Sequence, residues 1–329
     1  MVIIHAYTPL HFMQLKYLLE FEVLNEKSFI IVPKRFLSNV IFLKSDMCDV
    51  IYYNFDASSY TDTYFLSKAN CIFNEIPIRS IRKIIVPDIA YSLSNYLVSS
   101  LIRRNSLLEV SFYFDGSGSM MSSPVTFKTM ISDILKQLLS LIVSDSKYIK
   151  RNNELSGADL SICDKQLSII NNVRLTYSQK VKIVPELIDL PNSFQATEKI
   201  VIFVLQDAKV LMPGYLGLYK STLRFLSVKY PNYKVKLLLR NNDHEHYFHE
   251  KEIIVRDFVG ESAESIISRL KPKVVISHYS TVLLTLAFSK YRGEILSFSL
   301  SEYNKLVGEK QEVTDEVSLI FDALGINLV

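Results

Sequence analysis

The stretch that decides the fold is residues 107–119, which read LLEVSFYFDGSGS. Its aromatic and other apolar side chains predict a buried strand over 108–114. An acid and a glycine, Asp115 and Gly116, follow where that strand ends. In an open α/β sheet, a carboxylate at the carboxyl end of a strand points into the crevice where ligands bind, and glycine lets a ligand approach the backbone. Asp115 is therefore a candidate catalytic base, and an Asx-capped turn is the competing structural interpretation.

Strand and helix patterns alternate on both sides of this stretch, which predicts an α/β protein with parallel sheets wrapped by helices. The expected strands are 2–6, 28–33, 49–53, 82–87, 108–114, 199–205, 233–239, 273–277 and 294–298. The expected helices are 10–24, 58–70, 89–104, 124–143, 214–229, 261–270, 282–289 and 312–324. The pattern breaks over 145–195, so we expect two domains, 1–190 and 191–329.

Composition narrows the class of protein. A chain of 329 residues with 49% apolar content can build a sizeable core. Its 37 basic and 34 acidic residues leave a net charge of +3, which argues against a dedicated nucleic-acid binder. The three cysteines are widely spaced and form no CxxC pair, which argues against structural zinc or a disulfide framework and favours a reducing cytosol.

Neither a signal peptide nor a membrane-spanning helix is expected. The chain opens directly on the strand 2–6, and no run of about 18 apolar residues occurs. The segment 131–143 is nevertheless strongly apolar and is followed by Lys147, Lys150 and Arg151. We expect it either to pack between the domains or to lie on a membrane surface. The chain is therefore expected in the cytoplasm, with peripheral contact at the inner face of the cytoplasmic membrane as the second interpretation.

Two further motifs stand at strand-to-helix turns. Near the N-terminus, the strand 2–6 leads into Thr8-Pro9-Leu10-His11 at a helix start. Late in the chain, the strand 273–277 leads through His278 to the hydroxyl pair Ser280-Thr281. Backbone N–H groups at the start of a helix favour phosphate binding, and Ser and Thr are also the ordinary N-cap residues. The pair is therefore a candidate phosphate contact, with an ordinary N-cap as the competing interpretation, and His278 is either a ligand contact or a buried packing residue.

Taken in chain order, the three motifs resemble those of the bacterial GT-B sialyltransferases. The closest resemblance is to the family that sialylates lipooligosaccharide, capsule and O-antigen chains, glycosyltransferase family 52. That family has a Thr-Pro-Leu-Gln-like helix start, an acidic-acidic-Gly motif and a Ser-Ser or Ser-Thr pair before a late helix. Here these are Thr8-Pro9-Leu10-His11, Phe114-Asp115-Gly116 and Ser280-Thr281.

The resemblance implies two Rossmann-like domains facing a cleft, and an inverting transfer of sialic acid from CMP-sialic acid. The implied acceptor is a terminal galactose or related sugar of a bacterial surface glycan, or its lipid-linked precursor. Asp115 would be the base, with Thr8 and His11 on the acceptor side. Gly116 and the Ser280-Thr281 pair would contact the donor. No metal or other cofactor is expected, because a monophosphate ester and the carboxylate of the sugar replace the usual diphosphate–metal unit.

One departure keeps alternatives open. The family has a Lys-Pro-His-Pro-like motif after a strand of its second domain, and residues 233–246 keep the strand and a basic residue but lack the His-Pro pair. Arg240 and His244 are further donor-site candidates, and His244 is also the candidate acid. The surrounding run 243–249 holds three of the six histidines without an HExxH order, so a solvated loop or a metal site are its other interpretations. A GT-B enzyme that uses another nucleotide sugar, and a non-catalytic glycan- or partner-binding protein, are the competing functions.

Overall fold

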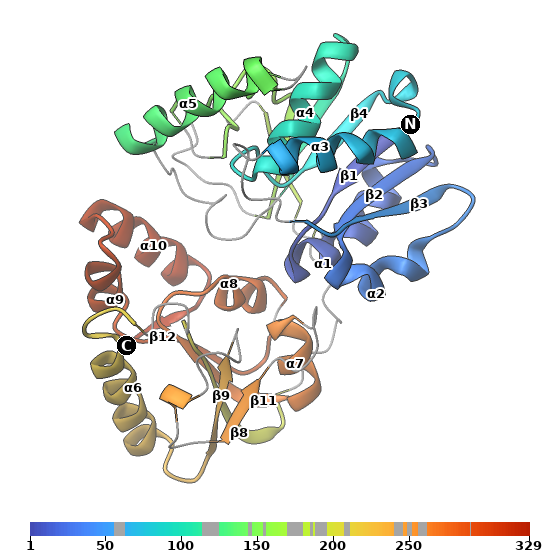
Figure 1. Ribbon diagram of the computed structural model, residues 1–329. Helices are drawn as coiled ribbons and strands as arrows, with labels where there is room; N and C mark the ends of the chain where they lie inside the picture. The colour runs from blue at the N-terminus through green and yellow to red at the C-terminus, as the bar shows by residue number, and fades with distance from the viewer. Residues whose placement is uncertain are drawn as a thin grey trace. The chain divides into compact units, whose positions relative to one another are not determined.

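The computed structural model describes residues 1–55, 63–113, 125–143, 147–153, 156–169, 180–184, 187, 196–206, 211–239, 246–248, 252–255, 262–289 and 291–329. The chain divides into two compact units, Met1–Asp189 and Leu190–Val329 (Figure 1). Each unit is a parallel sheet with helices on its faces.

The first unit has seven parallel strands in its described part, in the order β3-β2-β1-β4-β5-β6-β7. The strands are β1 (Val2–His5), β2 (Ser28–Pro33), β3 (Cys48–Tyr53), β4 (Lys83–Val86), β5 (Glu109–Phe112), β6 (Lys165–Ser168) and β7 (Val181–Ile183). The α-helices are α1 (Pro9–Tyr17), α2 (Leu37–Val40), α3 (Thr63–Ile72), α4 (Ser92–Arg104) and α5 (Phe127–Val143). A π-helical turn, Leu18–Glu22, continues α1.

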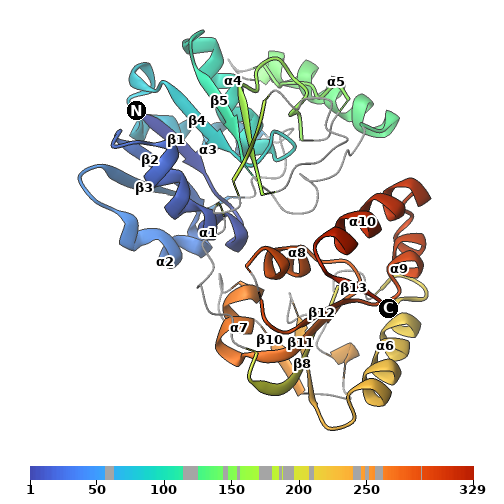
Figure 2. The same cartoon turned by 180° about the vertical axis from the view of Figure 1, so that it is seen from behind.

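The second unit has six parallel strands in its described part, in the order β10-β9-β8-β11-β12-β13 (Figure 2). The strands are β8 (Glu198–Val204), β9 (Lys234–Leu239), β10 (Glu252–Val255), β11 (Pro272–Ser277), β12 (Glu294–Ser297) and β13 (Asn327–Leu328). The helices are α6 (Tyr215–Lys229), α7 (Ala263–Leu270), α8 (Thr281–Phe288), α9 (Leu300–Val307) and α10 (Gln311–Ala323). The last helix, α10, packs on α9 and β13 within this unit.

The two units share one topology. In the first, β2 and β3 lie on one side of β1 while β4 and β5 lie on the other. In the second, β9 and β10 lie on one side of β8 while β11 and β12 lie on the other. This is the doubly wound, Rossmann-like arrangement, in which the direction of winding reverses beside the first strand. Each sheet therefore has a switch point, between β1 and β4 in the first unit and between β8 and β11 in the second.

Both cores follow the two-residue period of the strands. In the first unit, Ile3 and Ile84 face α3 and α4 and share a cluster with Phe65 and Leu97. In the second unit, one sheet face packs on α6 and α9, and its buried residues are Val201, Phe203, Leu237, Val274, Ile276 and Leu296, with Tyr219 and Tyr303 from the helices. These buried faces explain why the strands read as apolar runs in the sequence.

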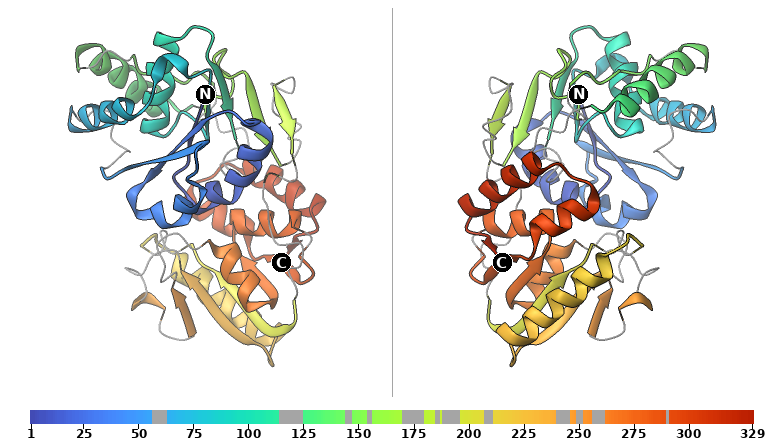
Figure 3. Two further views of the ribbon diagram at one scale, coloured as in Figure 1. Left: turned by 90° about the vertical axis from the view of Figure 1, so that its right-hand side faces the viewer. Right: turned by 90° about the vertical axis from the view of Figure 1, so that its left-hand side faces the viewer.

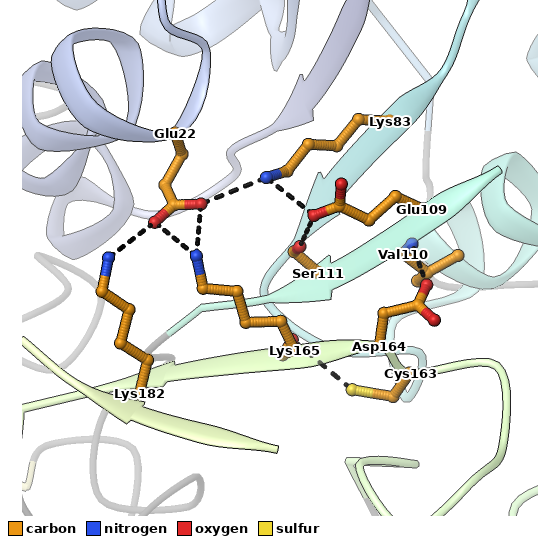
Figure 4. A network of polar contacts seen from close by, with 9 residues as sticks. All are labelled: Glu22, Lys83, Glu109, Val110, Ser111, Cys163, Asp164, Lys165 and Lys182. Atoms are coloured by element: carbon orange, nitrogen blue, oxygen red, sulfur yellow. Dashed lines mark hydrogen bonds and ion pairs between the residues drawn. The ribbon is translucent and has the colours of Figure 1, made fainter. Parts of the chain in front are cut away.

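A charged network lies near the amino-terminal ends of β4, β5 and β6 (Figure 4). The Glu22 carboxylate is 2% exposed and receives three lysine ammonium groups: Lys165 at 2.7 Å, Lys83 at 3.1 Å and Lys182 at 3.5 Å. Lys83 also pairs with Glu109 at 2.8 Å. One carboxylate therefore ties the end of the α1 segment to three strands, at the sheet edge opposite the switch point.

Along the described ranges, none of the helices combines the length and apolar character needed to cross a bilayer.

Candidate functional site

The turn from β1 into α1 is built by Thr8 and His11. Thr8 has an extended backbone, and its Oγ1 accepts a hydrogen bond from the N–H of His11 at 3.4 Å. Pro9 occupies the first turn, where a missing N–H costs nothing. The imidazole of His11 is fully buried, and its Nδ1 accepts from the N–H of Tyr7 at 3.2 Å. Both predicted acceptor-side residues therefore lie at the carboxyl end of β1, beside the switch point, where they also hold the turn together.

Tyrosine and histidine rings gather at this edge of the first sheet. Tyr7 and Tyr91 stack with centroids 4.1 Å apart and planes 14° apart, and both are half-buried. The rings in contact around them are His5, His11, Tyr53 and Tyr113. These tyrosines were not among the site residues predicted from the sequence. A signal was present, because Tyr53 ends β3 and Tyr7 and Tyr113 follow β1 and β5 within two residues.

His5 and Tyr113 fix the ends of β1 and β5 to one another. The Tyr113 hydroxyl donates to the backbone carbonyl of His5 at 2.7 Å, and His5 Nδ1 lies 2.9 Å from Ser94 Oγ. Burial, with a smaller effect of His11, lowers the pKa of His5 to about 3. The His5 imidazole is therefore neutral and structural. Tyr113 is the last described residue before the Asp115-Gly116 motif, so the chain enters that motif from an anchored position.

A carboxylate that the sequence analysis missed lies at the same switch point. Asp88 follows β4, and its Oδ1 accepts from the N–H of Tyr91 at 3.0 Å just before α4 begins. The signal was the one used for Asp115, an acid where a predicted strand ends. Asp88 holds the turn that carries Tyr91, at the carboxyl end of β4, where open α/β sheets bind their ligands.

In the second unit, the predicted hydroxyl pair lies at the switch point between β8 and β11. Ser280 is the N-cap of α8, with an extended backbone and an Oγ that accepts from the N–H of Val282 at 3.3 Å. Thr281 is the first helical residue, and both side chains are half-buried. The first turn of α8 carries no acidic residue. The helix dipole presents positive potential at this edge.

The two strands that flank this switch point are tied together. Ser277 Oγ donates to the carbonyl of Val204 at 2.8 Å, joining the ends of β11 and β8. Gln206, just beyond β8, donates from its side-chain amide to the carbonyl of Tyr279, and its backbone N–H donates to the Tyr215 hydroxyl at 2.8 Å. Gln206 was not selected from the sequence. It braces the loop that presents Ser280 and Thr281.

His278 lies inside the second unit and is fully buried. Its Nδ1 is 2.9 Å from the carbonyl oxygen of Phe298, and because a carbonyl only accepts, Nδ1 carries the proton. Its ring stacks on Tyr303, with centroids 5.6 Å apart and planes 12° apart. Burial lowers the pKa of His278 to about 4, against a smaller opposing effect of the Phe298 carbonyl. This environment matches the packing interpretation of His278, two residues from the proposed phosphate site.

Four predicted site residues, Asp115, Gly116, Arg240 and His244, lie outside the described residues and stay predictions. Of the histidine-rich run 243–249, the structure describes residues 246–248, and Phe248 is buried in the core of the second unit. Within the described part of the chain, no group of three or more His, Cys, Asp or Glu side chains is placed to hold a metal ion.

Comparison with known proteins bears on the fold. No protein-family model matches the chain, and no curated protein sequence matches it. Among solved structures it resembles the α/β-galactoside α-2,3-sialyltransferase of the luminous marine bacterium Photobacterium phosphoreum, with a TM-score of 0.52 and 13% sequence identity. That match covers 99% of this chain and 98% of the other.

Two further solved structures have lower TM-scores. Os79 from O. sativa, in complex with UDP and deoxynivalenol-3-glucoside, gives a TM-score of 0.49 at 11% identity, covering 90% of this chain and 80% of its own. The wall teichoic acid polymerase TagF gives 0.46 at 9% identity, covering 96% and 78%. The expected GT-B fold, two Rossmann-like domains, is confirmed. The features particular to family 52 stay a prediction.

Proposed function

We propose that this chain is an inverting glycosyltransferase that moves sialic acid from CMP-sialic acid to a terminal galactose or related sugar. The acceptor is a bacterial surface glycan or its lipid-linked precursor. The observation that carries the proposal is the placement of Ser280 and Thr281 at the start of α8, at the switch point of the second sheet. The full-length resemblance to a galactoside sialyltransferase fold supports the same assignment.

The α8 N-terminus suits the single phosphate of CMP. The Ser280 and Thr281 hydroxyls, at the positive end of the α8 dipole, can donate hydrogen bonds to the phosphate oxygens without a metal ion. These donors stabilise the negative charge that grows on the phosphate oxygen as the bond to the sugar breaks. Gly116, Arg240 and His244 remain proposed donor contacts, and His278 supports the loop from inside. We propose that no metal participates, so that EDTA leaves transfer unchanged.

The stacked pair Tyr7 and Tyr91 suits the acceptor. Aromatic side chains with a few polar groups are the usual lining of a small-molecule site. The pair lies at the switch point of the first sheet, half-buried, with Thr8 beside Tyr7 in the chain. A galactose ring has an apolar C–H face that can lie on a tyrosine ring, while its hydroxyls reach polar groups at the sheet edge. Tyr91 and Thr8 are therefore proposed acceptor contacts.

Asp115 is the proposed base. In the sequence it follows the anchored Tyr113 by two residues. Its carboxylate takes the proton of the acceptor hydroxyl as that oxygen bonds to the anomeric carbon of sialic acid. The bond from that carbon to the phosphate oxygen breaks, and CMP leaves with the electron pair. This single displacement inverts the β-linked donor to an α-sialoside, and such a base contributes about 10²–10⁴-fold in rate.

A thermal-shift titration with CMP, UDP, GDP and their nucleotide sugars tests the donor. A ligand at 100 times its dissociation constant stabilises the folded state by about 2.7 kcal/mol. We expect stabilisation by CMP and CMP-sialic acid only. Stabilisation by UDP or GDP instead would assign another nucleotide sugar to the same fold. Silence from every nucleotide would contradict the proposal and favour a non-catalytic binding protein.

A further inference from the structure

The helix α5 faces its polar side inward. Asp133 and Ser140 are fully buried on that side. Asp133 pairs with Arg151, and Ser140 Oγ accepts from the N–H of Tyr148 at 2.9 Å. An amphipathic helix on a globular protein normally buries its apolar stripe and exposes its polar one. Here the fixed, buried side is the polar one.

The outward side of α5 is apolar. Its exposed large apolar side chains range from 39% to 73% exposed, and they are Phe127, Ile131, Ile134, Leu135, Leu138, Leu139 and Leu141. This helix lies at the periphery of the first unit (Figure 3). No other helix in the described part of the chain exposes so many large apolar side chains.

The width of this apolar face distinguishes a partner helix from a membrane surface. At 100° per residue, the seven exposed positions span an arc of about 160°. A seam between two coiled helices is narrower, because it uses only the two apolar positions of each heptad. A wide apolar arc on a helix too short to span a bilayer is typical of a helix that lies in the membrane interface. Lys128 is the single charged residue on this arc, and it is exposed.

The charge around α5 favours a membrane with anionic lipids. Residues 127–151 hold five basic and two acidic residues, a net charge of +3 that equals the net charge of the whole chain. Asp133 and Arg151 neutralise each other inside, which leaves four lysines and one further acid in this segment. Lys128 at the start of α5 and Lys147 just beyond it are exposed. Basic residues beside an apolar face attract anionic lipid headgroups.

We propose that the outward face of α5 docks on the surface of an anionic lipid bilayer, with the helix lying in the interface and not spanning it. The proposal goes beyond the transfer reaction and does not depend on the donor. If the acceptor is lipid-linked, this docking holds the enzyme at the surface where its acceptor resides.

Vesicle flotation of the full chain tests the proposal. The vesicles are phosphatidylcholine alone, or phosphatidylcholine with an equal part of phosphatidylglycerol. The test variant is Leu135→Gln with Leu138→Gln, and the matched control is Leu211→Gln with Val228→Gln, two exposed positions of the second unit at 72% and 82%. The charge variant is Lys128→Gln with Lys147→Gln. Thermal unfolding with and without CMP shows that each variant keeps its fold and its nucleotide response.

We expect the parent chain and the control to float with the vesicles that contain phosphatidylglycerol. A smaller fraction should float in high salt, and a smaller fraction should float with vesicles of phosphatidylcholine alone. The leucine pair should lose at least about tenfold in vesicle affinity, and the lysine pair should lose affinity for the anionic vesicles in particular. Equal flotation of the leucine variant and the parent would overturn the proposal. If light scattering shows that the parent chain is a dimer and the leucine variant a monomer, the face binds a second copy of the chain instead. Neither result would touch the CMP response, so the two proposals fail separately.

Discussion

Arg151 binds Asp133 through two parallel hydrogen bonds, from Nε to Oδ2 at 2.9 Å and from Nη2 to Oδ1 at 2.7 Å. The backbone N–H of Arg151 and the hydroxyl of Tyr148 complete the shell of the carboxylate, each at 3.1 Å. Asp133 belongs to α5, and both partners belong to the segment 147–153. This one carboxylate therefore fixes which side of α5 faces inward.

Removing Arg151 should be strongly destabilising. Arg151→Met leaves the Asp133 carboxylate buried without a counter-ion, which typically costs about 3–5 kcal/mol. Arg151→Lys keeps the charge but not the paired geometry, so we expect an intermediate loss. Urea unfolding of the full chain measures the free energy of unfolding. A loss below about 1 kcal/mol for Arg151→Met would contradict the assignment of this pair as the anchor of α5.

Glu22 should contribute more to the free energy of unfolding than its neighbour Glu26. Burial alone would raise the pKa of Glu22, but the hydrogen bonds and charges of Lys165 and Lys83 hold it below its ordinary value. Glu22→Gln removes the carboxylate that pairs with three lysines. Because these ammonium groups can turn toward water, we expect the free energy of unfolding to fall by only about 1.5–3 kcal/mol.

The matched control for Glu22 is Glu26→Gln. Glu26 pairs with the N-terminal amine at 2.9 Å and with Arg82 at 3.3 Å, but its side chain is more exposed. Exposed pairs contribute about 0–1 kcal/mol. Urea unfolding of the two variants side by side is the measurement. Equal losses would mean that the Glu22 network is an ordinary surface cluster.

The strands that form the centres of both sheets could be predicted because burial on two faces makes them apolar runs. β1, β2 and β8 match their predicted ranges within one residue or so. β6 and β7 were missed, since β6 reads Lys-Gln-Leu-Ser and β7 has three residues, two of them exposed. β6 is a strand because it pairs with β5, and β7 because it pairs with β6; Lys165 and Lys182 also reach Glu22, and none of these contacts is local in sequence.

Acid should destabilise the chain through its buried histidines. The folded pKa values of His278, about 4, and His5, about 3, lie below the ordinary 6.5. The neutral forms are the folded ones, so this stability is present above pH 6.5 and is lost as the pH falls toward the folded values. Each histidine contributes a slope of about 1.4 kcal/mol per pH unit over that window.

The variant His278→Asn separates the effect of His278 protonation from that of His5. Its amide can donate to the Phe298 carbonyl as Nδ1 does, but it does not titrate. We expect the difference in unfolding free energy between pH 7 and pH 5 to shrink by about 2 kcal/mol relative to the parent. An unchanged difference in His278→Asn would show that His278 is protonated as readily in the folded chain as in the unfolded one.

The candidate site was predictable only where its chemistry is local. Ser280 and Thr281 stand between a strand and a helix in the sequence itself, so their position at a helix start could be read directly. The stack of Tyr7 on Tyr91 joins residues 84 positions apart, and it exists because β4 lies beside β1 in the sheet. Strand order is a global property, and no local pattern encodes it.

Asp115→Ala should abolish transfer and keep CMP binding. In the proposed mechanism the base acts on the acceptor hydroxyl and not on the nucleotide, so we expect its loss to lower kcat by at least about 10²-fold. Sialyl transfer to a soluble galactoside and CMP thermal shift are the two measurements. Asp88→Asn is the comparison, because an asparagine Oδ1 can still accept from the N–H of Tyr91. Loss of transfer in Asp88→Asn with activity retained in Asp115→Ala would move the role of base to Asp88.

Ser280 and Ser262 allow the two roles of an N-cap serine to be separated. Each caps an eight-residue helix of the second unit: Ser280 Oγ accepts from the N–H of Val282 at 3.3 Å, and Ser262 Oγ accepts from the N–H of Ser265 at 3.1 Å. Replacement of either by Ala removes a cap and should cost about 1 kcal/mol in unfolding free energy. Only the cap of α8 lies at the switch point between β8 and β11.

If Ser280 also binds the CMP phosphate, Ser280→Ala loses a hydrogen bond to a charged group, which contributes about 1.5–3 kcal/mol. We therefore expect CMP affinity to fall by at least about tenfold in Ser280→Ala and to stay at the parent value in Ser262→Ala. Calorimetric titration with CMP measures both. Equal affinities in the two variants would reduce Ser280 to a helix cap, and the phosphate would then have to be held by residues other than the hydroxyl pair.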